Sequence, residues 1–249
     1  MKVKNVFLLL IVGLIWFPSG KVWAESQGNK ILKQVDQNLF PSSYELYRKL
    51  INVEPDGSKR EFIFYTVRKG KDKIASLFLS PASEKGRATL RLGDNMWLYI
   101  PNVGRPIRIT SLQSVTGGIF NNADIMRLDF SVEYNCTELK EDKDNFILHL
   151  KAKTSNVAYD RLEMIVDKKR ILPKEIKCFA ASGMLIKTLH FKKIKSFGEG
   201  IVRPAIIETD SPLHKGYKSI MIFARLKKRD FPDEVFTFSF LPRLDSLRK

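Results

Sequence analysis

The segment FILHLKAKTSNVAYDRLEMIVD, residues 146–167, decides the fold class. It contains two short stretches in which apolar and polar residues alternate, separated by a polar turn. Because successive side chains of a β-strand point to opposite faces, this alternation predicts two strands. Their apolar side chains share one face of a sheet, namely those of Phe146, Leu148, Leu150, Leu162, Met164 and Val166.

The same pattern continues in both directions, with Gly- and Asp-rich turns between the segments. The predicted strands cover residues 44–53, 60–68, 74–80, 88–92, 96–100, 107–110, 130–139, 146–153, 160–167, 174–180, 185–195, 201–208 and 218–227. In the last of these, Ile220, Ile222, Ala224 and Leu226 are expected on the apolar face. We therefore expect a mainly β protein with a curved antiparallel sheet of about 11 strands. Residues 233–247 are ambiguous between a strand and a terminal helix.

A helix and an irregular segment accompany the strands. Apolar residues recur every three or four positions in residues 29–40, before Pro41, which predicts an amphipathic helix: Ile31, Leu32, Val35 and Leu39. Residues 111–128 break the alternation and contain Gly117-Gly118, which favours a lid with a short helix over 121–126. One long helix cannot cover so much apolar sheet, so the sheet either packs on itself as a sandwich or keeps a cavity.

The N-terminus has the pattern of a signal peptide. Lys2 and Lys4 precede an apolar run over residues 6–17, which is shorter than the roughly 20 residues of a membrane-spanning helix. Cleavage is expected after Ala24, giving a signal peptide over 1–24 and a single domain over 25–249; an uncleaved anchor is the alternative. No cysteine stands at the expected cleavage point, where a lipoprotein signal peptide needs one. The protein is therefore expected to be soluble in the periplasm and not itself a lipoprotein.

The charge balance is strongly basic. The chain has 43 Lys and Arg against 27 Asp and Glu, a net charge of +16. Removing Lys2, Lys4 and Lys21 with the signal peptide leaves 40 basic residues and a net charge of +13. Export excludes nucleic acid, so this charge favours anionic lipid headgroups or an acidic partner protein. The alternative is that lysines keep the strand edges soluble and unpaired.

The two cysteines are expected to be free. Cys136 and Cys178 lie on predicted strands that two other strands separate. Because neighbouring strands lie about 4.8 Å apart, the Cα atoms would exceed the roughly 7 Å limit for a disulfide.

Catalytic signatures are scarce in this sequence. His149, His190 and His214 are far apart and belong to no metal-binding motif, and neither a nucleophile elbow nor a phosphate-binding loop occurs. We predict no catalytic residue, no cofactor and no metal, and therefore not an enzyme.

The most distinctive segment is NMWLYIPNVGRPIRIT, residues 95–110. Trp97, Tyr99 and Pro101 followed by Arg105 and Arg108 resemble a signature of the outer membrane lipoprotein-sorting family, the LolA-like periplasmic carriers. Residues 114–130 and 231–237 also resemble that family, and the resemblance covers most of residues 29–247. It implies a half-open β-barrel capped by short helices around a hydrophobic cavity for acyl chains.

The function expected from this resemblance is a carrier that moves lipoprotein acyl chains or related lipids towards the outer membrane. An inner-membrane transporter and an outer-membrane acceptor are the expected partners. The alternative is a periplasmic lipid-sensing module that signals to an inner-membrane partner. Arg105 and Arg108 are expected to form a basic rim, and the expected cavity residues are Phe62, Phe64, Phe78, Leu90, Trp97, Tyr99, Phe146, Leu148, Met164 and Ile222.

Overall fold

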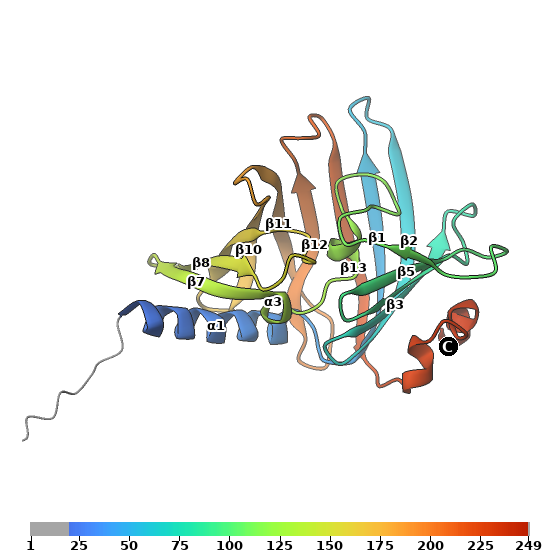
Figure 1. Cartoon of the computed structure of the whole chain (residues 1–249), viewed down its shortest axis with the longest axis horizontal. Helices are drawn as coiled ribbons and strands as arrows, with labels where there is room; N and C mark the ends of the chain where they lie inside the picture. Colours follow the sequence, from blue (N-terminus) through green and yellow to red (C-terminus); the bar gives the residue numbers. More distant parts are fainter. Residues whose placement is uncertain (1–19, 249) are drawn as a thin grey trace, which may run out of the picture.

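The computed structural model describes residues 20–248 and shows a strongly curved sheet with a long helix lying against it (Figure 1). That helix, α1 (Gly20–Leu39), contains almost all of the one expected over residues 29–40, and the four apolar residues of its pattern are buried. It also includes residues 20–24, the end of the predicted signal peptide. Residues 1–19, the rest of that peptide, lie outside the described residues.

All strands of the described chain belong to one antiparallel sheet of 13 strands. This is more than the expected 11 or so, because every predicted β segment contributes a strand. The segment predicted over residues 130–139 does so only from Tyr134, since residues 130–133 form a short helix. The strands are β1 (Tyr44–Val53), β2 (Lys59–Lys69), β3 (Lys73–Ser80), β4 (Ala88–Leu92), β5 (Asn95–Tyr99), β6 (Ile107–Ile109), β7 (Tyr134–Glu141), β8 (Asn145–Ala152), β9 (Arg161–Asp167), β10 (Leu172–Phe179), β11 (Leu185–Ser196), β12 (Val202–Asp210) and β13 (Lys218–Lys228).

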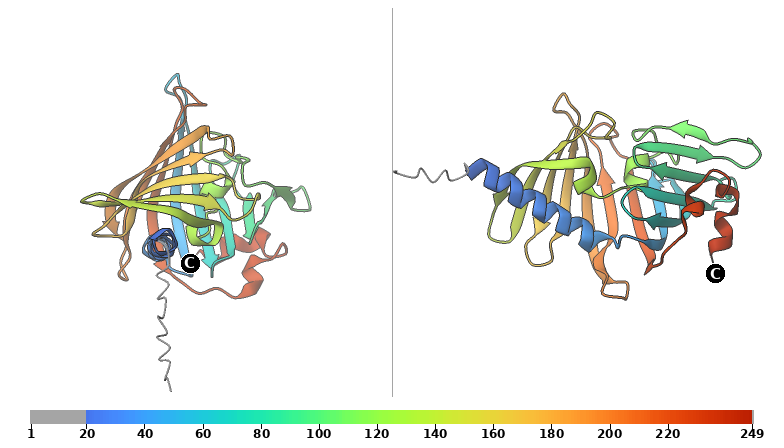
Figure 2. Two further views of the ribbon diagram at one scale, coloured as in Figure 1. Left: turned by 60° about the vertical axis from the view of Figure 1, so that its left-hand side comes forward. Right: turned by 60° about the horizontal axis from the view of Figure 1, so that its bottom comes forward.

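The strand order explains why the sheet has a lid. The order is β6-β5-β4-β3-β2-β1-β13-β12-β11-β10-β9-β8-β7, so the first and last strands meet in the middle and the sheet does not close. β6 and β7 are consecutive along the chain but form the two opposite edges. Their connection must therefore span the sheet, and it does so over the concave face, where it forms α2 (Asn122–Ile125) and α3 (Phe130–Glu133) (Figures 1 and 2). A single curved sheet excludes the sandwich alternative and confirms the mainly β, half-open architecture.

Two hydrophobic cores lie on the two faces of this sheet. The concave core packs α1, α2 and α3 against β1, β2 and β7 to β13. The convex core packs the C-terminal segment against β2 to β5. This segment forms two short 3-10 helices, η1 (Asp233–Phe236) and η2 (Leu241–Leu247), which resolves the ambiguity of the tail in favour of helix.

Alternation assigned the faces correctly on β8 and β9 but not on β13. Leu148, Leu150, Leu162, Met164 and Val166 are all in the concave core. On β13 the concave side chains are Met221 and Phe223, whereas Ile220 and Ile222 lie on the other face. Apolar residues fill consecutive positions here, so alternation does not decide the face. A bulge at Ala224, opposite Tyr47 and Arg48, then shifts the phase so that Leu226 returns to the concave core.

Candidate functional site

A small cavity lies on the concave face between the C-terminal end of α1, the α2–α3 region and strands β1, β12 and β13. Its walls are mainly apolar, with side chains that include Phe40, Tyr44, Ile125, Phe130, Met221 and Phe223. The free volume inside is about 30 Å³, which is room for one or two water molecules. The site is therefore closed in this conformation.

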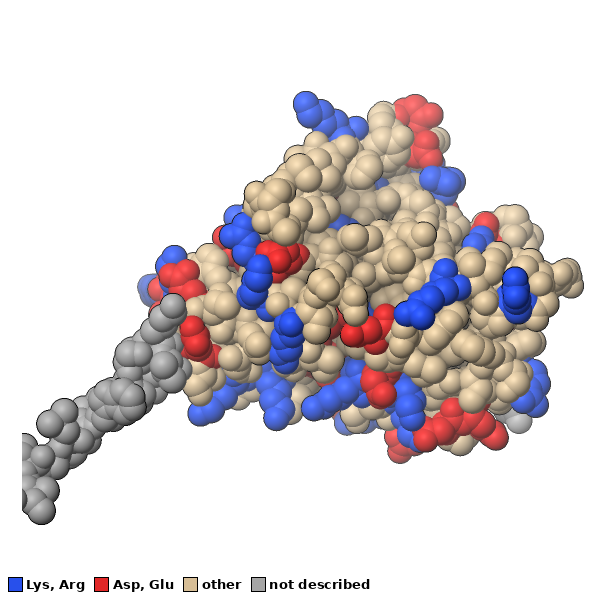
Figure 3. Space-filling model, viewed as in Figure 1, with Lys and Arg blue, Asp and Glu red and all other residues tan. Residues whose placement is uncertain are grey.

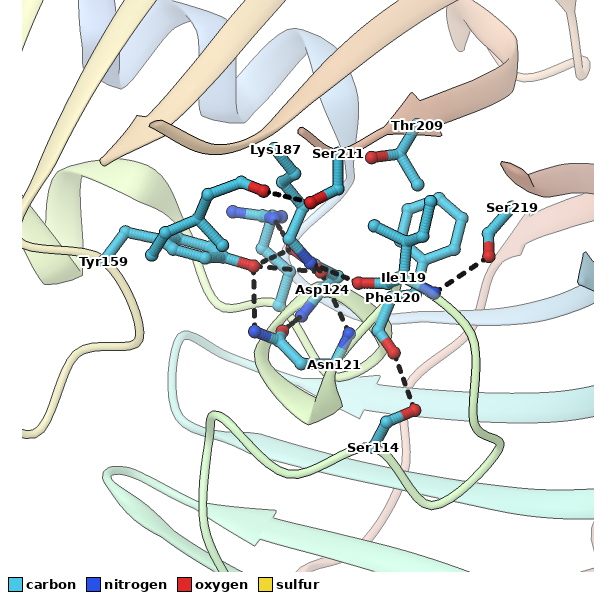
Figure 4. A network of polar contacts seen from close by, with 12 residues as sticks. Ser114, Ile119, Phe120, Asn121, Asp124, Tyr159, Lys187, Thr209, Ser211 and Ser219 are labelled. Carbon is cyan, nitrogen blue, oxygen red and sulfur yellow. Dashed lines mark hydrogen bonds and ion pairs between the residues drawn. The ribbon is translucent and has the colours of Figure 1, made fainter. Parts of the chain in front are cut away.

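The connection over residues 110–129, here called the lid, is fastened to the sheet by a buried polar cluster (Figure 4). Lys187 of β11 donates to a carboxylate oxygen of Asp124 at 2.7 Å and to the backbone carbonyl of Ile119 at 2.5 Å. The Tyr159 hydroxyl donates to Asp124 at 3.1 Å and accepts from the Asn121 side chain at 2.8 Å. We call this group of residues the latch.

The latch depends on the ionised form of Asp124. Burial alone raises the pKa of this carboxyl group, but Lys187 and Arg127 outweigh that effect and hold the pKa below its usual range. Both ends of the Asp124–Lys187 pair are almost fully buried. Breaking a buried pair leaves an uncompensated charge and typically costs 3–5 kcal/mol, so the latch holds the lid firmly.

The Gly117-Gly118 pair lies where the lid touches the sheet. Both residues have positive φ, +66° and +75°, a region that glycine adopts without steric strain. A Cβ atom on Gly118 would lie 2.2 Å from the side-chain oxygen of Asn52 on β1. Asn52 in turn donates to the carbonyl groups of Thr116 and Gly117, at 3.2 and 3.0 Å. The pair therefore permits a close approach of the lid backbone to β1.

Helix α1 is attached to the structures beside the cavity by its own polar contacts. The Asp36 carboxylate accepts from the backbone N–H groups of Phe130 and Ser131, at 2.7 and 2.8 Å, and so caps α3. Burial, reinforced by the nearby charge of Asp129, raises the pKa of Asp36 from 3.8 to about 6. Nearer the N-terminus of α1, Gly28 lies so close to Cys136 of β7 that a Cβ atom on Gly28 would clash with the sulfur.

The ten predicted cavity residues divide between the two faces, and none of them lines the cavity described above. Six belong to or pack against the concave core: Phe62, Phe64, Phe78, Phe146, Leu148 and Met164. Their contact with lipid stays a prediction. The other four have a different environment.

Leu90, Trp97 and Tyr99 lie on the convex side, where Trp97 packs edge to face with Phe238 at a centroid distance of 5.1 Å. Ile222 faces away from the concave core because its neighbours Met221 and Phe223 face into it. The prediction that these four line the same cavity is therefore corrected. Alternation groups residues by face but does not tell which face is concave, and here both faces carry an apolar core.

The predicted rim residues Arg105 and Arg108 lie at the β6 edge and are exposed. Arg105 is in the β5–β6 loop, and Arg108 on β6 donates to the side chain of Asn95. Neither residue lines the cavity. Elsewhere on the concave side, Lys and Arg gather along the lower edge of the face seen in Figure 3, below a largely uncharged centre.

The residues that sequence reasoning missed are charged residues inside the concave core. Arg48, Asp124, Lys187 and Arg203 are all buried, and none was singled out from the sequence. A signal was present for Arg48, which lies in phase with the buried Leu46 and Leu50, and for Arg203, which lies in phase with Ala205. A charged residue at an inward position of an alternating strand is the pattern to look for.

Both cysteines are free and buried, as expected, because β8 and β9 separate β7 from β10. Burial raises the pKa of Cys136 to about 11 and that of Cys178 to about 12. Within residues 20–248, no group of three or more His, Cys, Asp or Glu side chains is placed to hold a metal ion. No helix of this part of the chain is long and apolar enough to cross a membrane.

Comparison with known proteins assigns the family. A protein-family model described as "Uncharacterized protein" matches residues 70–243, more than half of the chain. The chain belongs to this family, and its fold is LolA-like. A LolA superfamily protein from Nitrosomonas europaea is 27% identical, with a TM-score of 0.78 over 86% of this chain and 98% of that one.

Two further solved structures have the same LolA-like fold. A DUF1329 family protein from Desulfovibrio piger is 22% identical, with a TM-score of 0.76 over 88% of this chain and 99% of that one. A putative outer membrane lipoprotein-sorting protein domain from Vibrio parahaemolyticus is 19% identical, with a TM-score of 0.74 over 88% and 100%. No curated protein matches the sequence. The resemblance drawn from residues 95–110 is thereby confirmed at the level of the fold.

Proposed function

We propose that the protein is a periplasmic carrier that binds the acyl chains of lipoproteins or related lipids and transfers them towards the outer membrane. The observation that carries this proposal is the apolar cavity covered by the lid and α1. Each CH₂ group of an acyl chain gains about 0.8 kcal/mol when it leaves water, so a carrier needs apolar walls that close over the chain. The likeness to the Nitrosomonas LolA superfamily protein supports the same function.

Binding requires this closed conformation to open. The free volume of about 30 Å³ is far below the roughly 300–1,000 Å³ of a typical ligand pocket. Two covers lie over the concave core: α1 packs against β7, β10 and β12, whereas the lid is held to β11 by Lys187 and to β1 by Asn52. We propose that an entering acyl chain displaces the lid or α1 and takes its place against the concave sheet face.

The proposed location and partners follow from this role. The signal peptide over residues 1–24 is proposed to direct the chain to the periplasm, where residues 25–249 act as one soluble domain without catalytic activity. An inner-membrane transporter is proposed as donor and an outer-membrane protein as acceptor. The basic surface of the domain suits anionic headgroups or an acidic partner surface.

The test is native mass spectrometry with lipid extraction on the mature protein purified without detergent. We expect about one acyl-bearing lipid per chain. The matched variants are Ile207→Trp, which fills the cavity, and Ile206→Trp on the opposite face of the same strand. Ile207→Trp should lose the lipid and Ile206→Trp should keep it. A protein that is empty and also takes up no fluorescent fatty acid would contradict the carrier, and stable capture of an inner-membrane regulator would then favour the lipid-sensing module.

A further inference from the structure

Four arginines on the concave side of the sheet are buried, and they fall into two pairs. Arg68 on β2 and Arg91 on β4 belong to the first pair, and Arg48 on β1 and Arg203 on β12 to the second. Each exposes 5% of its surface or less to solvent. A buried charge is strongly unfavourable unless it is paired and hydrogen-bonded, so the partners of each arginine show what it is for.

The first pair is fully accounted for by the fold. Arg68 donates to the carboxylate of Asp129 at 2.7 Å and to the carbonyl of Gly70 at 2.8 Å. Arg91 forms an ion pair with Glu133 and donates to the carbonyl groups of Gly93 and Met126, at 2.8 and 3.1 Å. These two arginines therefore fix the lid and α3 to the sheet.

The second pair has no carboxylate partner within residues 20–248. Of the three nitrogen atoms of Arg48, Nε and Nη2 are buried without a hydrogen-bond partner, and Nη1 reaches only the sulfur of Met221 at 4.0 Å. Arg203 donates to the carbonyl groups of Pro204 at 3.2 Å and Leu39 at 3.0 Å, and its Nη2 is buried without a partner. Both side chains line the cavity.

The surroundings of the two arginines hold them in place but do not neutralise them. The guanidinium of Arg203 lies between the rings of Phe40 and Phe223, 3.9 and 4.1 Å from their centroids. That of Arg48 lies 5.6 Å from the ring centroid of Phe64. Aromatic faces attract a cation and fix the plane of a guanidinium, yet they leave its N–H groups free. Burial lowers the pKa of Arg48 to about 10 and that of Arg203 to about 9, and the charge of Arg48 contributes to the second shift.

The acidic groups near the cavity are already engaged. Asp124 is the one carboxylate among the cavity-lining residues, and it is paired with Lys187 and Arg127. The contact of Arg203 with Leu39 gives it a structural role at the C-terminal end of α1, where a cation is favourable. Arg48 has no comparable structural contact. Together the two side chains that line this apolar cavity have three nitrogen atoms without a hydrogen-bond partner, Nε and Nη2 of Arg48 and Nη2 of Arg203.

We propose that Arg48 and Arg203 bind the anionic head of the acyl ligand, a carboxylate or phosphate group, so that the ligand enters the cavity head first. This inference rests on the proposed carrier function and narrows the ligand to an acidic amphiphile. Guanidinium groups bind carboxylates and phosphates through paired N–H···O bonds that are about twice as strong as neutral hydrogen bonds. The acyl tail then lies along the concave apolar face.

The test compares ligands with one tail and different heads. Oleate, oleyl alcohol and methyl oleate are titrated against the mature protein at pH 8 by displacement of the neutral probe N-phenylnaphthylamine. We expect oleate to bind at least about tenfold more tightly than the two neutral ligands, because hydrogen bonds to a charged group are worth about 1.5–3 kcal/mol. A lysophosphatidic acid with one oleoyl tail distinguishes a phosphate head from a carboxylate head, and the tighter of the two identifies the chemistry of the anion.

The variants separate a binding role from a folding role. Arg48→Met should abolish the preference for oleate while the neutral ligands bind as before, and Arg225→Met, on the exposed face of β13, should keep it. Without ligand, Arg48→Met should melt at the wild-type temperature or above, since it removes an unpaired buried charge. Arg91→Met should lower the melting temperature, because it leaves the buried carboxylate of Glu133 without its ion-pair partner.

Each outcome distinguishes the two proposals. Equal binding of oleate and oleyl alcohol to the wild type would overturn the anion site but leave the carrier standing. Failure of every acyl ligand to displace the probe, with an empty protein in native mass spectrometry, would overturn the carrier. An Arg48→Met variant that unfolds would also overturn the anion site, because it would show that Arg48 stabilises the ligand-free fold.

Discussion

The two faces of the sheet are packed by different means. On the convex face, Leu241 and the aromatic rings of Phe231, Phe236 and Phe240 fill the space under the C-terminal segment with apolar contacts. On the concave face, a core of similar chemistry contains buried charges: the Asp124–Lys187 pair, two paired arginines and two unpaired ones. The convex side also has a buried acid, Glu45, but it pairs with Arg229 at 2.7 Å. Buried charges that are paired serve the fold on both faces. The two unpaired arginines are therefore the feature that distinguishes the concave face.

The largest effect should follow from breaking the latch. Lys187→Met leaves Asp124 buried with only Arg127 as its ion-pair partner, so we expect the free energy of unfolding to fall by about 3–5 kcal/mol. Urea denaturation measures this. The matched control is Lys192→Met, on the same strand as Lys187. It removes an exposed ion pair with Glu208 of β12 and should cost less than about 1 kcal/mol. Equal losses in the two variants would show that the latch is no stronger than a surface ion pair.

A similar loss of stability on the convex face should leave binding intact. Leu241, the first residue of η2, is fully buried, and Leu241→Ala should lower the free energy of unfolding by about 3 kcal/mol through the lost contacts and the cavity that it leaves. We expect the uptake of acyl ligand at a temperature well below melting to stay at the wild-type level. Reduced uptake by the folded variant would mean that the two faces are coupled.

The approach of the lid to β1 can be disturbed at a single position. Gly118→Ala places a methyl group against Asn52 on a backbone with positive φ, so we expect a loss of about 2 kcal/mol. Hydrogen exchange should speed up in residues 110–121 and remain unchanged in the convex core. Gly57→Ala is the control, because Gly57 also has positive φ but meets nothing within 4 Å. If both variants behave alike, backbone strain and not the contact with Asn52 sets the effect.

The smallest expected effect is a pH dependence that comes from Asp36. Its folded pKa of about 6 lies above the unfolded value near 3.8, so the folded state binds the proton more tightly. Stability from this group therefore rises as the pH falls from 7 to 5, by about 1 kcal/mol, and levels off below about pH 4. Asp36→Asn should lack this rise. Melting curves of both proteins at pH 7 and pH 5 give the difference, and a wild type that loses stability relative to the variant would contradict the assignment.

The strands and the covering helix could be predicted from the sequence because their signals are local. Alternation in residues 146–167 correctly predicted strands over residues 146–152 and 161–167, and the spacing of Ile31, Leu32, Val35 and Leu39 predicted their burial in α1. The order of the strands and the side on which the sheet curves are not local properties. For that reason Leu90, Trp97 and Tyr99 were grouped with residues of the opposite face.

The charged groups of the site escaped prediction for a related reason. Lys187 and Asp124 are 63 residues apart, and Arg48 and Arg203 lie on strands that meet only through β13. Asp124 and Lys187 look like ordinary surface residues in the sequence. The phase of Arg48 and Arg203 along their strands indicates an inward position but not which residues surround them. On β13 the run of consecutive apolar residues and the bulge at Ala224 removed the phase information altogether.

The connection between β6 and β7 limits how far the two edges of the sheet can move apart. Both free edges of the sheet are joined by one covalent span, residues 110–133. The sheet therefore cannot flatten beyond the reach of that span, whatever the strength of its hydrogen bonds. Its length sets the widest mouth that the concave face can present, so inserting or deleting residues in its irregular part should change the size of the molecules admitted.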